Sequence, residues 1–301
     1  MQTVAPFSYD FWVAMAPETV LLIGLVAIFI IPNLGNSKMR IPLTNVRIPW
    51  FLGGRRFRLT GAAHVPGLIA TATLFTAFFI ATWGQFNGEF TEVLVKSGEV
   101  TLMKIDGFAR IFEIIFLGAI LLAAMASLDR VPATTYEETD ELDEMYNNRR
   151  QVDLYILMLT TAIGMSMVAL AQDLFVLFVG LELASLATYV LVAFHKESKS
   201  GSEGGVKYFI VGSVASAVGL YGLSLLYLWS GSLQLDVLAS QWATNGDEVL
   251  PIIALGLVLV GFGFKVSAAP FHFAAPDAYA GANSPVAGIL ATASKGMGMI
   301  G

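Results

Sequence analysis

The chain carries a series of apolar runs, each about as long as a helix that spans a lipid bilayer. The hydrocarbon core of a bilayer is about 30 Å thick and needs about 20 mostly apolar residues per helix. Seven complete runs and the start of an eighth fit this description. They are approximately Val13–Ile31, Val65–Trp83, Phe108–Leu128, Leu154–Leu170, Leu174–Phe194, Tyr208–Trp229, Val249–Ala275 with a break, and a last run that opens at Ser284. We therefore predict an all-α fold, a polytopic transmembrane helix bundle of about seven to eight helices.

The composition supports a membrane location and excludes several kinds of chemistry. Of the 301 residues, 56% are hydrophobic and 13% are charged, and the mean hydropathy of +0.70 is too high for an ordinary soluble domain. The chain has no cysteine, which rules out disulfides, thiolate metal or iron–sulfur sites and cysteine nucleophiles. The sequence has no basic patch with interleaved aromatic residues, so we expect no nucleic-acid partner. Any redox chemistry is expected on a partner protein.

Lysine and arginine residues sort to one side of the predicted membrane. Such residues accumulate in cytoplasmic loops, and twelve of them fall in or beside the loops after the first, third and fifth runs. The twelve are Lys38, Arg40, Arg47, Arg55, Arg56, Arg58, Arg130, Arg149, Arg150, Lys196, Lys199 and Lys207. The alternate loops hold only Lys96 and Lys104. This sorting predicts a multi-pass protein of the cell inner (plasma) membrane with its N-terminus outside.

Glu182 is an isolated charge within an apolar run. It lies near the middle of Leu174–Phe194, which holds no other charged residue, beside small residues that allow another helix to approach. A charged side chain at the bilayer centre costs about 2.5–3.5 kcal/mol on insertion scales, and such residues mark ion or proton pathways. We therefore predict that Glu182 relays protons or ions. A protonated carboxyl that is hydrogen-bonded in a helix interface is the alternative.

Lys265 ends the apolar stretch Pro251–Phe264, and three prolines follow it closely. Proline interrupts helices, and broken transmembrane helices line watered cavities in which free helix ends bind ions. We therefore predict a helix break at Lys265 and a lysine that exchanges a proton there, with a lysine extending to the cytoplasmic surface as the alternative. A Glu182–Lys265 pair whose separation changes would switch the proton affinity of the lysine.

Three further residues are candidates for the same relay. Lys295 repeats the pattern in the last run, with an interfacial anchor as its alternative. Lys207 lies at the cytoplasmic end of a run without other charges. Its side chain either extends to the membrane surface or takes part in the proton relay, and the sequence favours neither. His272, within the predicted break, could shuttle protons near neutral pH or simply satisfy loose backbone carbonyls.

Other polar and small residues are expected to be structural. Arg110 and Glu113 lie three apart, so on a helix they share a face and pair locally. Asp173 is predicted to cap the helix that follows it, and Asp277 to occupy a turn or a cap. A stripe of small residues at intervals of three or four predicts close helix packing, with no catalytic role. The stripe consists of Gly212, Ser213, Ser216, Gly219 and Gly222.

Several long, ordered motifs in the chain match a known family. The motifs are Gly261–His272, Pro276–Ala282, Ser284–Lys295, Gly180–Leu186 and Asp106–Arg110. They resemble the antiporter-like proton-pumping subunits of respiratory complex I, and the match covers nearly the whole chain. The amino-acid sequences of Tyr279–Ala282 and Ser294-Lys295 are most similar to those of subunit N, rather than to those of subunits L or M or of the multisubunit sodium/proton antiporters.

The resemblance implies a larger protein with two inverted repeats, each containing one broken helix. Residues 1–150 would hold three N-terminal transmembrane helices with cytoplasmic loops, and residues 151–301 the first proton-translocating repeat. Because the last run is still apolar at Gly301, we expect an N-terminal portion that is truncated in its last helix and lacks the second repeat.

The resemblance also implies which residues and partners take part. Proton relay would pass through Glu182, Lys207, Lys265 and Lys295. No cofactor is expected on this chain, whereas the electron donor (NADH or another), flavin, iron–sulfur clusters and quinone are expected on other subunits. The expected partners are the lipid bilayer and the M-, L-, K-, J- and A-type membrane subunits.

The predicted function is proton translocation by a non-redox membrane subunit of an NADH–quinone oxidoreductase of the complex I type. A subunit of a multisubunit sodium/proton antiporter is the alternative. A substrate transporter would need a substrate-binding constellation, which the sequence lacks, and a purely structural scaffold would need no buried Glu or Lys.

The predicted orientation can be tested by labelling, because the chain contains no cysteine. Arg55→Cys and Asn147→Cys are each expected to react with an impermeant thiol reagent only from the cytoplasmic side. Asn245→Cys is expected to react only from the opposite side. The reverse labelling pattern would overturn the orientation inferred from the loop charges.

Overall fold

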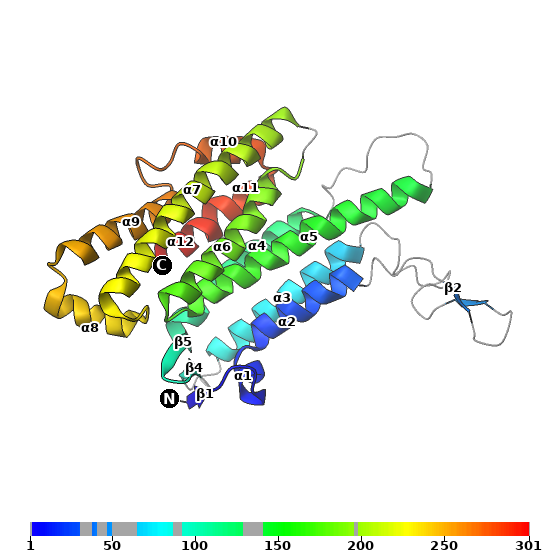
Figure 1. Ribbon diagram of the computed structural model, residues 1–301. Coiled ribbons are helices and arrows are strands. Elements are labelled where there is room, and N and C mark those ends of the chain that lie inside the picture. Colours follow the sequence, from blue (N-terminus) through cyan, green and yellow to red (C-terminus); the bar gives the residue numbers. More distant parts are fainter. Residues whose placement is uncertain are drawn as a thin grey trace.

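The computed structural model describes residues 2–30, 38–40, 47–49, 65–86, 92–128, 141–195 and 198–300, with the backbone alone for 38–40, 47–49 and 141–150. Long helices dominate these ranges, and a small sheet lies at one end (Figure 1). The helices are α1 (Tyr9–Ala14), α2 (Ala16–Ile30), α3 (Val65–Phe86), α4 (Gly107–Ala126), α5 (Glu141–Leu170), α6 (Leu174–Val192), α7 (Lys199–Ser230), α8 (Leu235–Asn245), α9 (Val249–Val266), α10 (Ala275–Gly281), α11 (Ser284–Ile289), the π-helical turn η2 (Leu290–Ser294) and α12 (Lys295–Ile300). The strands are β1 (Gln2–Val4), β2 (Lys38–Arg40), β3 (Arg47–Pro49), β4 (Val93–Ser97) and β5 (Val100–Ile105).

Six helices of the described part are long and apolar enough to cross a membrane by length and composition. They are α3, α4, residues Gln151–Leu170 of α5, α6, α7 and α9. The prediction of a polytopic transmembrane helix bundle is therefore confirmed. Of the cytoplasmic charges predicted from the sequence, Arg55, Arg56, Arg58, Arg130 and Lys196 lie outside the described residues.

The first apolar run differs from its prediction. The helix does not run unbroken from Val13, because α1 ends with Met15 as its C-cap and α2 begins at Ala16. Pro17 favours the first turn of a new helix, where its missing N–H is not needed. With 15 residues, α2 covers roughly 22 Å along its axis, which is less than the hydrocarbon thickness.

A small sheet, which the all-α prediction does not include, lies at the end of the bundle where α4 begins (Figure 1). β1 pairs with β4 in parallel, and β4 pairs with β5 antiparallel through a turn at Gly98, whose φ of 64° suits glycine. Val4, Val93 and Ile105 pack against Ala109 in the first turn of α4. Strands of three to six residues are much shorter than the apolar runs of about 20 residues that identify transmembrane helices, so those runs do not predict them.

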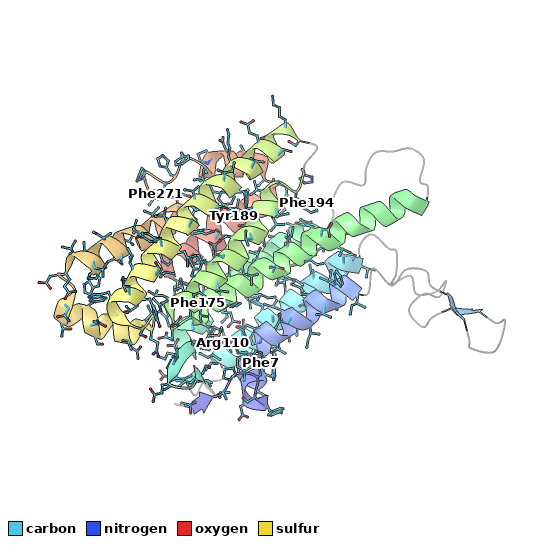
Figure 2. All side chains as sticks on the ribbon, in the orientation of Figure 1. Phe7, Arg110, Phe175, Tyr189, Phe194 and Phe271 are labelled. Atoms are coloured by element: carbon cyan, nitrogen blue, oxygen red, sulfur yellow. The ribbon has the colours of Figure 1, made fainter. Side chains whose placement is uncertain are left out.

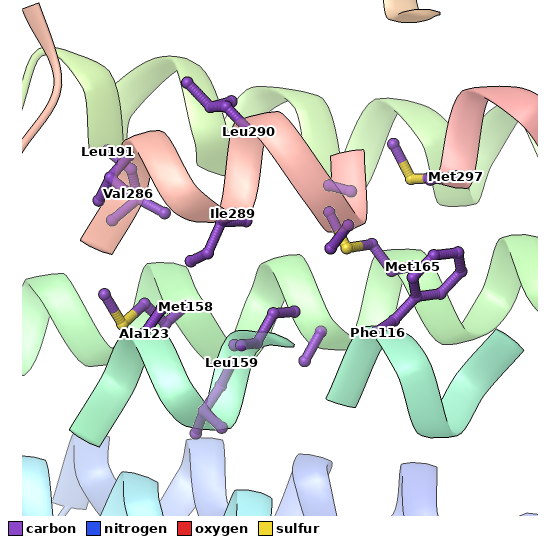
Figure 3. Close-up of a cluster of buried hydrophobic side chains, with 14 of the residues drawn as sticks. Phe116, Ala123, Met158, Leu159, Met165, Leu191, Val286, Ile289, Leu290 and Met297 are labelled. Atoms are coloured by element: carbon purple, nitrogen blue, oxygen red, sulfur yellow. The ribbon is translucent and has the colours of Figure 1, made fainter. Parts of the chain in front are cut away.

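α5 is the central helix of the bundle. Of its most apolar window, 72% is buried within the protein, compared with 28% for α9. Figure 3 shows side chains of α4, α5 and the α11–α12 region packed together, among them Phe116, Met165 and Met297. The peripheral faces of α7 and α9 remain apolar and exposed, as expected for helices that contact lipid or another membrane subunit.

The small-residue stripe of α7 packs closely against α9, as predicted. A Cβ atom added to Gly222 would lie 2.7 Å from the carbonyl oxygen of Ala254 and 2.7 Å from the amide nitrogen of Val258. Such distances are shorter than side-chain contacts allow, so glycine at this position sets the separation of the two backbones. α7 and α9 are the helices that present Ser216 and Lys265, so their separation also fixes the geometry of the site.

The close contact at Gly222 predicts that an added methyl group destabilises the protein at this position, but not at Gly256 on the facing helix α9. Gly222→Ala is expected to lower the free energy of unfolding by about 1–3 kcal/mol, because the added methyl group meets backbone atoms. Gly256→Ala on α9 is the matched control, since nothing lies within 4 Å of its Cβ position. The control is expected to be neutral or up to about 1 kcal/mol stabilising. Thermal unfolding of the purified proteins measures both, and equal stabilities would contradict the packing described here.

Candidate functional site

α9 ends inside the break predicted from the sequence. Val266 is its last residue, and Ser267 follows in the left-handed conformation with φ of 56° and ψ of 43°. The chain then turns through residues 268–274 before α10 begins at Ala275. The helix break predicted at Lys265 is confirmed.

Lys265 occupies the last turn of α9 and is only 5% exposed. Its ammonium group donates a hydrogen bond to the hydroxyl of Ser185 on α6. The same group lies 5.3 Å from the centre of the Tyr189 ring, within the range of a cation–π contact. This burial contradicts the alternative in which Lys265 extends to the cytoplasmic surface.

Glu182 lies on α6 one turn before Ser185, so the two residues share a face of the helix. Its Oε1 accepts a hydrogen bond of 2.5 Å from the Ser216 hydroxyl of α7. Among the described residues no ion pair joins Glu182 to Lys265, so the direct contact expected from the sequence is absent from this conformation. Instead, the Ser185 hydroxyl accepts a hydrogen bond from Lys265, and the Ser216 hydroxyl donates one to Glu182.

Glu182, Ser216 and Lys265 line one cavity. The cavity has a volume of about 30 Å³, and its remaining wall consists of apolar and glycine residues of α6, α7 and α9. A volume of this size is sufficient for one or two water molecules, which need polar partners of the kind that these three side chains provide. The cavity therefore connects the carboxylate and the lysine through groups that can both donate and accept a proton.

Lys295 lies at the free end of α9. Its ammonium group donates to the hydroxyl of Ser267 and lies 3.4 Å from the backbone carbonyl oxygen of Lys265. A cation is favourable beside the exposed carbonyls at a helix C-terminus. The π-helical turn η2 immediately precedes Lys295, and such turns often occur at functional sites. The break in α9 thus brings together two of the three lysines of the predicted relay, Lys265 and Lys295.

Lys207 lies in a surface ion-pair network rather than in the cavity. Its side chain is 47% exposed and pairs with Glu203 at 2.7 Å and with Asp277 at 2.8 Å. The prediction that no other charge shares its helix is wrong, because α7 begins at Lys199, earlier than the predicted run, and includes Glu203. Asp277 lies in the first turn of α10, as expected, and has this additional partner.

His272 is exposed in the turn after α9. Its backbone carbonyl accepts a hydrogen bond from the amide of Ala275. Among the described residues its imidazole has no hydrogen-bond partner, so the structure does not connect it to the other candidates of the relay.

No pattern in the sequence predicts a role in the relay for the serines of the site. Ser185 is one of the small residues beside Glu182, and Ser216 is part of the packing stripe. Ser267 had no role beyond a family motif. Serine is common in membrane helices, and only the tertiary contacts distinguish these three from the others. The one signal in the sequence is the spacing of three between Glu182 and Ser185.

Two structural predictions are confirmed. Asp173 caps α6, with Oδ1 accepting hydrogen bonds of 2.8 Å and 3.3 Å from the amides of Phe175 and Val176. Arg110 and Glu113 form an ion pair three residues apart. Within the described ranges, no group of three or more His, Asp or Glu residues is arranged to hold a metal ion.

Comparison with known proteins shows what this chain is similar to. Residues 171–301, which include Glu182, Lys207, Lys265 and Lys295, match the family described as NADH:quinone oxidoreductase/Mrp antiporter, transmembrane. This segment is therefore similar to the membrane proteins of that family. The resemblance identified from the motifs is confirmed.

The chain is similar to two relatives that are named subunit N and to a chain in one solved structure of respiratory complex I. The chain is 40% identical over 193 residues to "NADH-quinone oxidoreductase subunit N" of Desulfitobacterium hafniense, covering 64% of this chain and 36% of the relative. It is 35% identical over 239 residues to "F(420)H(2) dehydrogenase subunit N" of Methanosarcina mazei, covering 79% of this chain and 45% of the relative. A chain in a structure of respiratory complex I from Thermus thermophilus superposes with a TM-score of 0.66 at 25% identity, covering 94% of this chain and 52% of that one. The chain thus spans less than half the length of the two relatives.

The contact between Ser185 and Lys265 predicts a measurable contribution to stability. Ser185→Ala removes an oxygen that solvates a buried ammonium group, and we expect the free energy of unfolding to fall by about 1–3 kcal/mol. Ser240→Ala, at an exposed position on α8, is the control and should stay within about 0.5 kcal/mol of the parent. Thermal unfolding in detergent measures the difference. Equal stability of the two variants would show that Ser185 does not support Lys265.

Proposed function

We propose that the chain is part of a non-redox membrane subunit of a complex I-type NADH–quinone oxidoreductase. In this proposal the subunit moves protons across the bilayer while quinone is reduced elsewhere in the complex. The named relatives and the superposed chain support the type of complex. The single observation that supports proton transfer is the burial of Lys265 at a helix break, beside a cavity that it shares with Glu182.

The first step of the proposed relay is a change in the distance between Glu182 and Lys265. A nearby carboxylate favours the charged form of a lysine, and its withdrawal favours release of the proton. The hydroxyls of Ser185 and Ser216 each contact one of the two groups. Because a hydroxyl both donates and accepts, these serines can pass a proton between the cavity and Lys265.

The second step passes the proton along the break in α9. Lys295 lies at the carbonyl of Lys265, and two ammonium groups in a poorly solvated site disfavour each other. Protonation of Lys265 therefore promotes release from Lys295 toward the remainder of the full-length protein. Lys207 and His272 remain candidates for proton exchange with the cytoplasm, consistent with their exposure.

The energy that this relay requires is similar to the interaction energy of one pair of opposite charges. Moving one charge against the membrane field costs about 2.3 kcal/mol per 100 mV. Two charges about 4 Å apart interact by roughly 4 kcal/mol at an effective dielectric constant of about 20. A change in the Glu182–Lys265 contact alone is therefore sufficient to drive the transfer of a proton at Lys265.

The remaining features of the proposal follow from the same assignment. The protein would lie in the cell inner membrane with its N-terminus outside, and would assemble with the M-, L-, K-, J- and A-type membrane subunits. Residues 1–150 and 151–301 would be its N-terminal helices and its first proton-translocating repeat. Flavin, iron–sulfur clusters, quinone and the electron donor would bind to other subunits.

A sodium/proton antiporter subunit is the second candidate, because the matched family also includes the Mrp antiporters. The names of the relatives favour the complex I type. Copurification with a quinone reductase activity, and proton transport that does not depend on sodium, would distinguish the two.

The relay predicts that each buried charge is needed for pumping. In the full-length protein, Glu182→Gln or Lys265→Ala is expected to lower the rate of proton pumping at least tenfold, equivalent to about 1.4 kcal/mol or more, while the complex still assembles. Glu182→Asp keeps the charge on a shorter side chain and should retain part of the activity. Proton uptake by inverted membrane vesicles, normalised to the amount of assembled complex, provides the measurement.

A double variant and a surface control complete this experiment. Because coupled sites are not additive, Glu182→Gln combined with Lys265→Ala should lose less than the sum of the two single losses. Glu99→Gln, in the exposed turn between β4 and β5, should pump normally. Assembled complexes in which both single variants pump normally would leave only a structural role for Glu182 and Lys265.

A further inference from the structure

A second group of buried charges lies outside the relay. It consists of Glu18 on α2 and Arg110 and Glu113 on α4, which are 4%, 4% and 0% exposed. Figure 2 shows Arg110 toward the end of the bundle that carries the sheet, apart from Tyr189 beside the relay. We call these three residues the outer triad.

One guanidinium group contacts both carboxyl groups of the outer triad. Nη1 of Arg110 forms a short ion pair with Oε2 of Glu113 and lies 3.9 Å from Oε1 of Glu18. Nη2 of Arg110 donates a hydrogen bond of 2.6 Å to the carbonyl oxygen of Ala14 at the end of α1. The carboxyl groups of Glu18 and Glu113 therefore lie next to each other, beside the same nitrogen atom of Arg110.

The charges of the outer triad do not balance if both acids are ionised. Two carboxylates and one guanidinium give a net charge of −1 in a site that water does not reach. Within the described part of the chain, no lysine or arginine other than Arg110 forms an ion pair with Glu18 or Glu113. An uncompensated buried charge is strongly unfavourable.

The neighbouring elements do not supply a compensating charge. In their described residues, α3, α11 and η2 hold no charged side chain. Asp10 of α1 is exposed, and Lys104 pairs with Asp106 at 3.0 Å before α4 begins. Asp153 lies far along α5 from its end at the sheet, and Lys295 of α12 is bound to Ser267.

Among the residues that the structure describes, three buried oxygens of the outer triad have no hydrogen-bond donor. They are Oε1 and Oε2 of Glu18 and Oε1 of Glu113. Buried acceptors of this kind are costly when they are left without a donor. A proton on one carboxyl group would supply that donor and remove the excess negative charge, as in other pairs of adjacent acids that share one proton.

We infer that the outer triad is a proton-binding site that holds one proton, shared between the carboxyl groups of Glu18 and Glu113. With one proton on this pair of acids and one guanidinium group beside them, the triad is neutral. The neutral triad lets Arg110 keep its hydrogen bond to Ala14 and so anchors α1 at the sheet-bearing end of the bundle. This site is independent of the cavity between Glu182 and Lys265 and is outside the proposed relay.

Infrared spectroscopy of the full-length protein in its native complex tests this inference. A protonated carboxyl group has a carbonyl band apart from the amide bands, and the band shifts when H₂O is exchanged for D₂O. At neutral pH, Glu18→Gln is expected to lose one protonated-carboxyl equivalent relative to the parent. Glu113→Gln is expected to lose the same equivalent, because in either variant the one remaining carboxyl group balances Arg110 as a carboxylate.

The controls make every outcome decisive. Glu99→Gln, at the exposed turn between β4 and β5, should leave the band unchanged. Both single variants should assemble at parental levels, since each keeps one carboxylate for Arg110, whereas Glu18→Gln combined with Glu113→Gln leaves Arg110 without a counterion and should reduce assembly several-fold. An unchanged band in Glu18→Gln, or failure of either single variant to assemble, would overturn the shared proton.

Discussion

A buried ammonium group at the end of a broken helix is the constraint on which the site depends. Lys265 is buried, so oxygen and aromatic groups of the protein must take the place of most of its solvent. Ser185 and Tyr189 on α6 provide these contacts, and the cavity shared with Glu182 provides space for water. Because α6 and α9 both contribute, the stability of the charged lysine is tied to the position of one helix relative to the other.

Close helix packing and the break in α9 work together to produce this arrangement. The glycines of α7 let its backbone approach α9 closely, which places Ser216 beside Glu182 on α6. The end of α9 at Val266 exposes carbonyl groups that a second lysine, Lys295, can contact. A continuous helix would satisfy these carbonyls internally and would leave Lys295 without its partner at this point.

Much of this architecture could be predicted because membrane burial leaves strong signals in a sequence. The apolar runs predict the six candidate spans, and the prolines and glycines after Lys265 predict the end of α9. Isolated charges predict that Glu182 and Lys265 lie in one site, since each is costly in hydrocarbon. The absence of a direct contact between them could not be predicted, because the hydroxyls of Ser185 and Ser216 that contact them instead depend on how three helices pack. The sheet and the contact between Glu18 and Arg110 could not be predicted for a related reason. Short strands leave no periodic signal in the sequence. Glu18 lies 92 positions from Arg110 along the chain, which is too far for a periodic pattern to connect them.

The proposed relay requires Lys265 to alternate between charged and neutral forms during transport. Arginine can fill the same position with a cation and can donate to Ser185, but it does not lose its proton in proteins. The most direct measurement is therefore proton pumping by Lys265→Arg in the assembled full-length complex, compared with its quinone reductase activity. The account predicts a complex that assembles and reduces quinone but pumps few protons through this subunit. Pumping at the parental rate would contradict it, because a permanent cation would then be sufficient.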